Sequence, residues 1–288
     1  MTAPNLLTAL ILLLSPLTAA NVYIIAGQSN ALGQGNLKNT SEKHVPRLKA
    51  NPSVQVAKAV LNINTVKRAH AKGSSYPYHT YKNNSFSNAG LGSGWNSTFG
   101  VEIGLVESLT KQGVEDIYII KFAVGGASLI ENFSKAATGP PLYNDLITMV
   151  KTHLKTIADQ NDGTYSLNGM YWIQGEADAS NAARTKAYQH SFQTFLKNLR
   201  TDIGHDELKV AFIPLNEKAQ LKAAGSVAQY QAHTVKINQD LSNLATQDPL
   251  LYVAPSPNGY HIYDNVHYTG DAYLTIGAQL GSVLPIPR

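Results

Sequence analysis

Short apolar runs bounded by turn residues recur along this 288-residue chain. They predict β-strands at 22–26, 117–122, 169–173, 209–214 and 250–254. The stretches between them have the pattern of amphipathic helices, at 99–113, 142–160, 182–202, 218–246 and 270–283. Strands that alternate with helices are typical of a parallel sheet covered on both faces. The pattern therefore predicts an α/β fold in which a central, mostly parallel, five-stranded sheet lies between two helical layers.

Residues 36–98 interrupt this alternation. They are rich in Asn, Ser, Lys and Gly and contain a single β-prone piece at 54–66. We expect a long excursion with irregular loops near the carboxyl edge of the sheet. Neither an internal repeat nor a linker divides the chain, so residues 21–288 are expected to form one domain.

The composition agrees with a globular domain and excludes some partners. Apolar residues make up 43% of the chain and charged residues 15%, which is enough apolar material for a core. The 23 Lys and Arg residues against 19 Asp and Glu give a net charge of +4, but no basic run is longer than Lys67-Arg68. We therefore expect no nucleic-acid partner. Cysteine is absent, so no disulfide can form.

The first twenty residues differ from the rest. An apolar core from Leu6 to Leu14 is followed by Pro16 and by the small residues Ala19 and Ala20. This predicts a signal peptide at 1–20, cleaved near Ala20, although its start lacks the usual Lys or Arg. The alternative is a membrane anchor, but the stretch falls short of the roughly 20 apolar residues that span a bilayer. We expect a secreted protein with no membrane attachment after cleavage, and candidate glycan sites on surface loops at Asn39, Asn83, Asn96 and Asn132.

Three polar turns follow predicted strands directly: 26–30, 123–128 and 174–178. Because ligands of open α/β sheets bind outside the carboxyl ends of the strands, these turns predict a site at that edge. The first turn, "AGQSNALGQG", contains Ser29. A serine hydroxyl needs a base, commonly a histidine oriented by a carboxylate. Asp264 and His267 have a spacing that lets one loop present both groups, although an ordinary solvated loop is the alternative.

Taken together, several stretches resemble one family. The nucleophile elbow G-x-S-x-G of α/β-hydrolases is not met, because Ala31 stands where its second glycine would be. The stretches "IIAGQSNALGQG", "FGVEIGL", "KFAVGGASL", "WIQGEADA" and "DNVHYTGDAY" instead resemble the SGNH (GDSL-like) hydrolase superfamily. The likeness is greatest to its sialate O-acetylesterase and acetylxylan esterase branch of carbohydrate esterases. It implies a three-layer α/β/α sandwich of the flavodoxin-like SGNH type.

The resemblance also implies roles for individual residues. Ser29 would be the nucleophile, His267 the general base and Asp264 its orienting partner. The oxyanion hole would use the backbone N–H groups of Ser29 and Gly126, and Gly125-Gly126 would let the backbone approach a ligand closely.

The third oxyanion donor in most of the superfamily is an asparagine in a G-x-N-D block. Here the turn reads Gln174-Gly175-Glu176-Ala177-Asp178, and Ala177 stands near the place of that asparagine. We therefore assign the side-chain amide of Gln174 to this role. Gln28, Asn30 and Glu176 are assigned to substrate binding.

Two other chemistries compete for the same residues. His261, Asp264 and His267 have intervals found in zinc sites, but neither H-E-x-x-H nor a second cluster follows, so we expect no metal and no cofactor. Glu176 and Asp178 could be the acid and base of a glycosidase. Two residues apart on one turn, they cannot easily flank a glycosidic bond, and we interpret them as supporting hydrogen-bond partners.

The sequence thus predicts a secreted serine esterase that removes O-acetyl groups from a carbohydrate through an acyl-enzyme. The alternatives are a non-catalytic carbohydrate-binding protein on the same fold and a general short-chain or lipase-like carboxylesterase. Xylan, sialic acid and other acetylated glycans are not distinguished. We expect aromatic residues near the loops to stack on sugar rings: Tyr76, Tyr78, Tyr81, Trp95 and Trp172.

Overall fold

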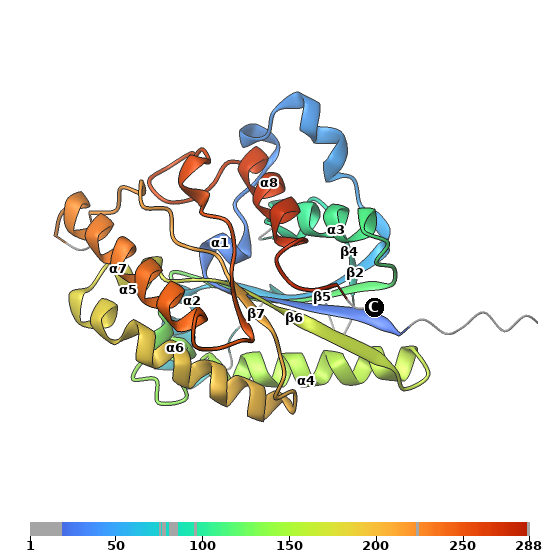
Figure 1. Cartoon of the computed structure of the whole chain (residues 1–288), viewed down its shortest axis with the longest axis horizontal. Helices are drawn as coiled ribbons and strands as arrows, with labels where there is room; N and C mark the ends of the chain where they lie inside the picture. Colours follow the sequence, from blue (N-terminus) through green and yellow to red (C-terminus); the bar gives the residue numbers. More distant parts are fainter. Residues whose placement is uncertain are drawn as a thin grey trace, which may run out of the picture.

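A single sheet lies between two layers of helices in the computed structural model (Figure 1), which describes residues 19–74, 76, 79–80, 86–94, 97–222 and 225–286. The sheet order is β3-β2-β5-β1-β6-β7-β8, and β4 also pairs with β2. All strands from β2 to β8 in that order are parallel, whereas β3 and β4 pair with β2 in the antiparallel direction. The strands are β1 (Ala20–Gly27), β2 (Asn51–Asn62), β3 (His79–Thr80), β4 (Ser87–Ala89), β5 (Ile117–Gly125), β6 (Tyr165–Ile173), β7 (Val210–Phe212) and β8 (Leu251–Val253).

The helices divide between the two faces of the sheet. In Figure 1, α3 and α8 lie on one side of the sheet and α4, α6 and α7 on the other. The five predicted helices are all present, but α7 begins nine residues later than expected, because the side chain of Ser226 caps it by accepting the Gln229 N–H. The helices are α1 (Ser29–Leu32), α2 (Ile63–Ala71), α3 (Glu102–Lys111), α4 (Tyr143–Gln160), α5 (Glu176–Ala179), α6 (Ala182–Ile203), α7 (Val227–Ala245) and α8 (Gly270–Leu280).

The sheet is wider than the five strands predicted, and this part of the prediction was wrong. β2 pairs with β5 from Val54 to Asn62, so the β-prone piece expected inside the excursion is a parallel strand of the central sheet. The polar residues of β2 interrupt the apolar pattern of a buried strand. One of them, Lys58, is 8% exposed and directs its Nζ to the carbonyl oxygens of Gly92 and Gly94. A buried lysine that finds acceptors in a neighbouring loop breaks the apolar run by which a buried strand is recognised.

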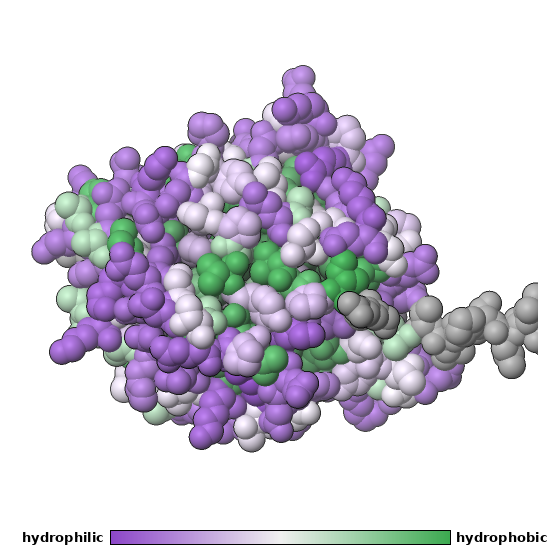
Figure 2. All heavy atoms as spheres, viewed as in Figure 1, coloured by the Kyte–Doolittle hydropathy of each residue, from purple (hydrophilic) through white to green (hydrophobic). Residues whose placement is uncertain are grey.

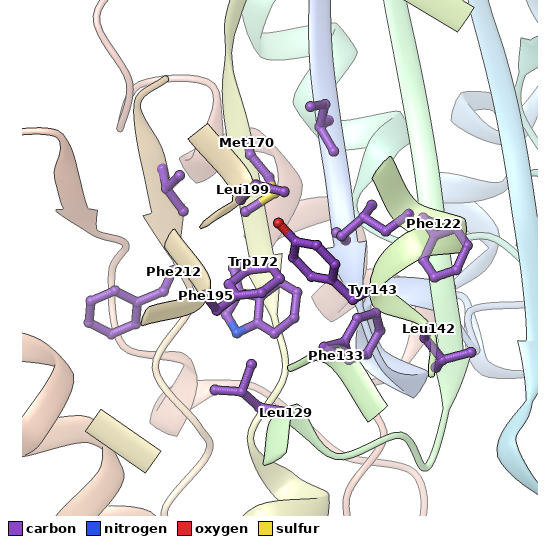
Figure 3. Packing of buried hydrophobic residues seen from close by; sticks show 14 of the residues in the cluster. Phe122, Leu129, Phe133, Leu142, Tyr143, Met170, Trp172, Phe195, Leu199 and Phe212 are labelled. Atoms are coloured by element: carbon purple, nitrogen blue, oxygen red, sulfur yellow. The ribbon is translucent and has the colours of Figure 1, made fainter. Parts of the chain in front are cut away.

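Alternate residues of each central strand enter two cores. Along β1, Val22 and Ile24 pack in the core under α4 and α6, whereas Tyr23 and Ile25 pack in the core under α3 and α8. Trp172 on β6 is fully buried in the first of these cores, among aromatic and aliphatic side chains (Figure 3). The prediction that Trp172 stacks on a sugar was therefore wrong.

A buried ion pair supports the second core. Lys121 Nζ lies 2.8 Å from Glu102 Oε2, and neither side chain is exposed to solvent. The other oxygen of Glu102 accepts hydrogen bonds from Ser93 Oγ and from the Gly100 N–H. These bonds connect β5 and α3 to Ser93 and Gly100, and the neighbouring Phe99 makes a bridge to Gly35, just after the Ser29 turn. The pair thus stabilises the support beneath that turn.

The surface and the helices bear on the expectation that the protein has no membrane attachment. The face shown in Figure 2 is mostly hydrophilic, with hydrophobic residues grouped across its middle, where the sheet lies between its helices in Figure 1. Among the described residues, no helix has the length and apolar character needed to cross a membrane.

The side chain of Asn132 is 2% exposed. Its amide nitrogen donates to the Pro140 carbonyl and its amide oxygen accepts the Ser128 N–H, so Asn132 is not the surface glycan site that we expected. Asn39 remains a candidate, and Asn83 and Asn96 lie outside the described residues.

Glu102→Gln should destabilise the protein by about 3–5 kcal/mol, because it leaves the Lys121 ammonium buried without its counter-charge. Urea unfolding measures this loss. Lys155→Met is the matched control: it breaks the exposed Lys155–Asp159 pair and should cost below about 1 kcal/mol. Equal losses in the two variants would contradict the role given to the buried pair.

Candidate active site

The turn that contains Ser29 is fixed by the close approach of β1 and β6. A Cβ atom on Gly27 would lie 2.0 Å from the carbonyl oxygen of Ile173, and Gly27 has a φ of 146°, so only glycine fits there. The chain then leaves β1, and Ser29 begins the short helix α1. The turns after β5 and β6 lie beside it, as expected for parallel neighbours. The three predicted turns therefore meet at one edge of the sheet.

His267 and Asp264 form a close pair in the loop before α8. Asp264 Oδ2 lies 2.7 Å from His267 Nδ1, and Asp264 Oδ1 accepts the backbone N–H groups of Val266 and His267, both at 2.8 Å. Burial raises the pKa of the Asp264 carboxyl, but these hydrogen bonds outweigh it and hold the pKa below its ordinary value. Asp264 is thus an ionised partner that orients the ring and leaves Nε2 available.

Asn30 connects the serine turn to the histidine loop. Its Nδ2 donates to Glu176 Oε1 at 2.6 Å and to the Val266 carbonyl at 3.3 Å, and its Oδ1 accepts the Tyr273 hydroxyl at 2.7 Å. Asn30 is 1% exposed and its amide is fully used. Because the Asn30 amide is already bonded on all sides, its position does not favour the predicted contact with substrate. It favours a role in holding the His267 loop against the Ser29 turn.

A cleft of about 470 Å³ opens where these elements meet. Of the predicted residues, those that line it are Gln28, Ser29, Gly125, Gly126, Glu176 and His267. No hydrogen bond joins the side chains of Ser29 and His267 in this part of the described chain, and such contacts often tighten only when substrate binds.

The cleft wall also includes three residues that the sequence analysis missed: Asn62, Lys67 and Arg184. Asn62 ends β2 and caps α2 by accepting the Asn64 N–H at 2.9 Å, a capping signal that was present in the sequence. Lys67 lies on α2, and Arg184 on α6 is paired with Glu131. Asn62 and Lys67 reach the cleft because β2 is a strand of the sheet and α2 follows it directly, whereas Arg184 reaches the cleft from α6.

Two backbone N–H groups in the cleft are available to a ligand. Among the described residues, no hydrogen bond acceptor is found for the N–H of Ser29 or of Gly126. Gly126 has a φ of 79°, a conformation that turns the chain immediately after β5. Ser29 and Gly126 both line the cleft, so these two donors are open to a ligand oxygen there.

Gln174 is not placed at the cleft. Its Nε2 lies 2.6 Å from Asp178 Oδ2 and 3.0 Å from the Ala127 carbonyl, and its Oε1 lies 2.8 Å from the Tyr188 hydroxyl. The residue is 2% exposed and absent from the cleft wall. Gln28 Oε1, at 3.2 Å, is a third acceptor for the two hydrogens of this amide, so the geometry does not support the predicted oxyanion role of Gln174.

The two acidic residues of the same turn differ in their surroundings. Asp178 is fully buried and accepts hydrogen bonds from Ser128 Oγ and from the Leu129 N–H in addition to Gln174. Glu176 lines the cleft, its Oε2 has no partner among the described residues, and burial raises its pKa. They do not form a pair that faces one ligand, and so they do not have the arrangement of a glycosidase acid and base.

The zinc hypothesis likewise finds no geometry to support it. Within the described ranges, no three His, Asp, Glu or Cys side chains are grouped to hold a metal ion, and the Nδ1 of His267 is already bonded to Asp264.

Comparison with solved structures shows the fold. A protein from Arabidopsis thaliana aligns with a TM-score of 0.60 and 17% identity, over 92% of this chain and 97% of that one. A carbohydrate acetylesterase from Xanthomonas citri aligns with a TM-score of 0.59 and 17% identity, over 90% of this chain but only 55% of that longer protein. NanS aligns with a TM-score of 0.56 and 14% identity, over 91% and 95% of the two chains. No curated protein sequence matches significantly.

A family model identifies the chain itself. The model is described as "Carbohydrate esterase, sialic acid-specific acetylesterase" and matches residues 19–284, nearly the whole described chain. The serine turn, the histidine loop and the cleft between them all lie inside this match. The chain belongs to the sialic acid-specific acetylesterase family of carbohydrate esterases, and is a carboxylic ester hydrolase.

Proposed function

We propose that this esterase removes O-acetyl groups from a carbohydrate through a Ser29–His267–Asp264 triad and an acetyl-enzyme. The observation that supports this most strongly is the Asp264–His267 pair, held by two backbone N–H groups at a cleft that also contains Ser29 and two unpaired backbone donors. Neither a binding protein nor a structural loop requires a carboxylate-oriented imidazole beside an unpaired serine.

In the first half of the reaction, His267 Nε2 removes the proton from Ser29 Oγ as this oxygen attacks the acetyl carbonyl carbon. The carbonyl oxygen becomes an oxyanion that accepts the Ser29 and Gly126 N–H groups, each such donor being worth about 10²–10³ in rate. Asp264 stabilises the imidazolium. The carbon–oxygen bond to the sugar then breaks, and His267 returns the proton to the departing hydroxyl.

In the second half, a water molecule takes the place of the sugar. His267 removes one proton from the water as its oxygen attacks the acetyl group on Ser29. The second tetrahedral intermediate uses the same two backbone donors, and its collapse returns the proton to Ser29 Oγ and releases acetate.

The cleft fits a polar substrate. Amide and hydroxyl groups of Gln28, Asn62 and Ser128 line it together with the charged Lys67. The predicted aromatic contacts do not contribute among the described residues, because Trp172 is buried and Tyr76 packs on the core outside the cleft; Tyr78, Tyr81 and Trp95 lie outside the described residues.

We also propose secretion, with removal of the leader predicted at residues 1–20. Most of this segment lies outside the described residues. Cleavage after Ala20 would remove the first residue of β1, which pairs with Tyr165, and the mature chain would begin at Asn21 inside this strand, where Asn21 pairs with Ser166.

Ser29→Ala should abolish turnover of 4-nitrophenyl acetate apart from a small residue, while the melting temperature changes little. His267→Ala should be about as damaging, and the double variant little worse, because members of a triad act as a unit. Steady-state kinetics and phosphonate labelling of Ser29 test this. Additive losses, or labelling of another serine, would contradict the triad.

Asp264→Asn should lower kcat and also change how stability depends on pH. Because the pKa of Asp264 is lowered in the folded protein, its carboxylate contributes stability above about pH 4, which is lost as the pH falls through that lower pKa. The wild type should therefore exceed the variant in stability at neutral pH, and the difference should shrink in acid. Urea unfolding at several pH values measures this. A difference that does not change with pH would contradict it.

The acyl group and the glycan are tested together by following acetate release from acetylated xylan, O-acetylated sialic acid and nitrophenyl esters of increasing length. We expect activity on an acetylated carbohydrate and a steep decline beyond short acyl chains. A preference for octanoate or longer would favour a lipase-like carboxylesterase instead.

A further inference from the structure

The oxyanion hole described above has two backbone donors, and the side-chain amide predicted as the third, Gln174, is committed elsewhere. A second glutamine amide lines the cleft and has a nitrogen that could donate a hydrogen bond to a ligand. We propose that Gln28, the residue before the nucleophile, donates the third hydrogen bond to the oxyanion through its Nε2. This inference rests on the proposed function and names a catalytic residue for it.

The orientation of the Gln28 amide is fixed by its oxygen. Oε1 accepts the backbone N–H of Ala177 at 3.1 Å and of Gly175 at 3.4 Å, and Gln174 Nε2 lies 3.2 Å from it. Backbone N–H groups can only donate, so the atom facing them must be the oxygen. The nitrogen of the amide therefore faces away from the β6–α5 turn.

The nitrogen of the Gln28 amide is not used within the described part of the chain. Among the described residues it donates no hydrogen bond, although the side chain is only 4% exposed and lines the cleft beside Ser29. Gln28 Nε2 is not one of the fully buried polar atoms that lack a partner in the described part of the chain, so its hydrogen-bonding capacity is open to water or to a ligand in the cleft. An oxygen atom of the reacting ester in the cleft would satisfy it.

The position of this amide matches a gap in the sequence pattern. Ala177 stands near the place where most of the superfamily has the oxyanion asparagine. Gln28 Oε1 accepts the backbone N–H of Ala177 itself. The carboxamide therefore reaches the same turn from the end of β1, the strand beside β6. The side chain of the residue preceding the serine thus brings an amide to the turn where residue 177 has none.

Asn62 is the competing donor. Its Oδ1 caps α2, and its Nδ2 lies 3.8 Å from the point where a Cβ on Gly125 would be. It comes from β2, on the far side of β5 from the β6–α5 turn. That position suits a contact with the sugar or the acetyl methyl group better than a contact with the oxyanion.

The test compares five variants, one of them Asn62→Ala for the competing donor, on 4-nitrophenyl acetate and on a 4-nitrophenyl methylphosphonate that reacts with Ser29. Gln28→Ala removes the donor, and Gln28→Glu removes it while keeping oxygen acceptors for Gly175 and Ala177. The double variant Gln28→Ala with Ala177→Asn places an amide where the superfamily has one. Gln239→Ala, an exposed glutamine on α7, is the matched control.

Both single Gln28 variants should lower kcat by about 10²–10³ with KM changed far less, and should slow phosphonylation by a similar factor. Gln28→Glu should melt close to the wild type, because its acceptors remain. The double variant should recover at least about tenfold in both rates relative to Gln28→Ala. A merely structural role of Gln28 predicts no such rescue.

The inference is overturned if Gln28→Ala keeps kcat within a few-fold of the wild type, or if Ala177→Asn restores nothing. It is also overturned if Asn62→Ala, and not Gln28→Ala, shows the loss in kcat and phosphonylation. Failure of the proposed function is a separate result: it is seen when Ser29→Ala retains activity, whatever the Gln28 variants do.

Discussion

The site depends on a carboxylate buried beneath it. Asp178 binds Ser128 and the Leu129 N–H of the turn after β5, and it binds Gln174 at the end of β6. Burial raises the pKa of Asp178, and these donors oppose that effect and compensate its lost hydration. The carboxylate thereby holds together two turns that strand pairing alone would leave free to move.

From Asp178 a continuous set of hydrogen bonds leads to the cleft. Gln174, fixed by Asp178, lies against Gln28 Oε1, and Gln28 precedes Ser29. The role of Gln174 follows from this arrangement: it positions the amide of Gln28 and does not itself reach the reacting atoms. A buried network of this kind is rigid because every member loses a partner if any one moves.

The histidine loop is attached differently. Asp264 and His267 lie near the surface, and their loop is held to the serine turn by Asn30, which bonds Val266, Glu176 and Tyr273 at once. The proposed base therefore comes from an accessible loop, whereas the proposed nucleophile and its backbone donors come from the carboxyl edge of the sheet. This division places the group that must exchange protons with substrate and water at the open side of the cleft.

The sequence by itself determined the local features: β1, β5 and β6, the long helices, the turns with Ser29 and Gly126, and the Asp264–His267 spacing. Each rests on periodicity or on residues close together in the chain, whose geometry does not depend on distant partners.

The tertiary structure decided the rest. The β-prone piece at 54–66 was not recognised as a strand of the central sheet, because Lys58 is buried only through acceptors in a loop thirty-odd residues away. Trp172 and Gln174 look in the sequence like site residues, but Trp172 packs in the core and Gln174 is taken up by Asp178. Whether an amide or an aromatic ring faces a ligand depends on which other side chains compete for it, and that competition exists only once the sheet has brought the turns together.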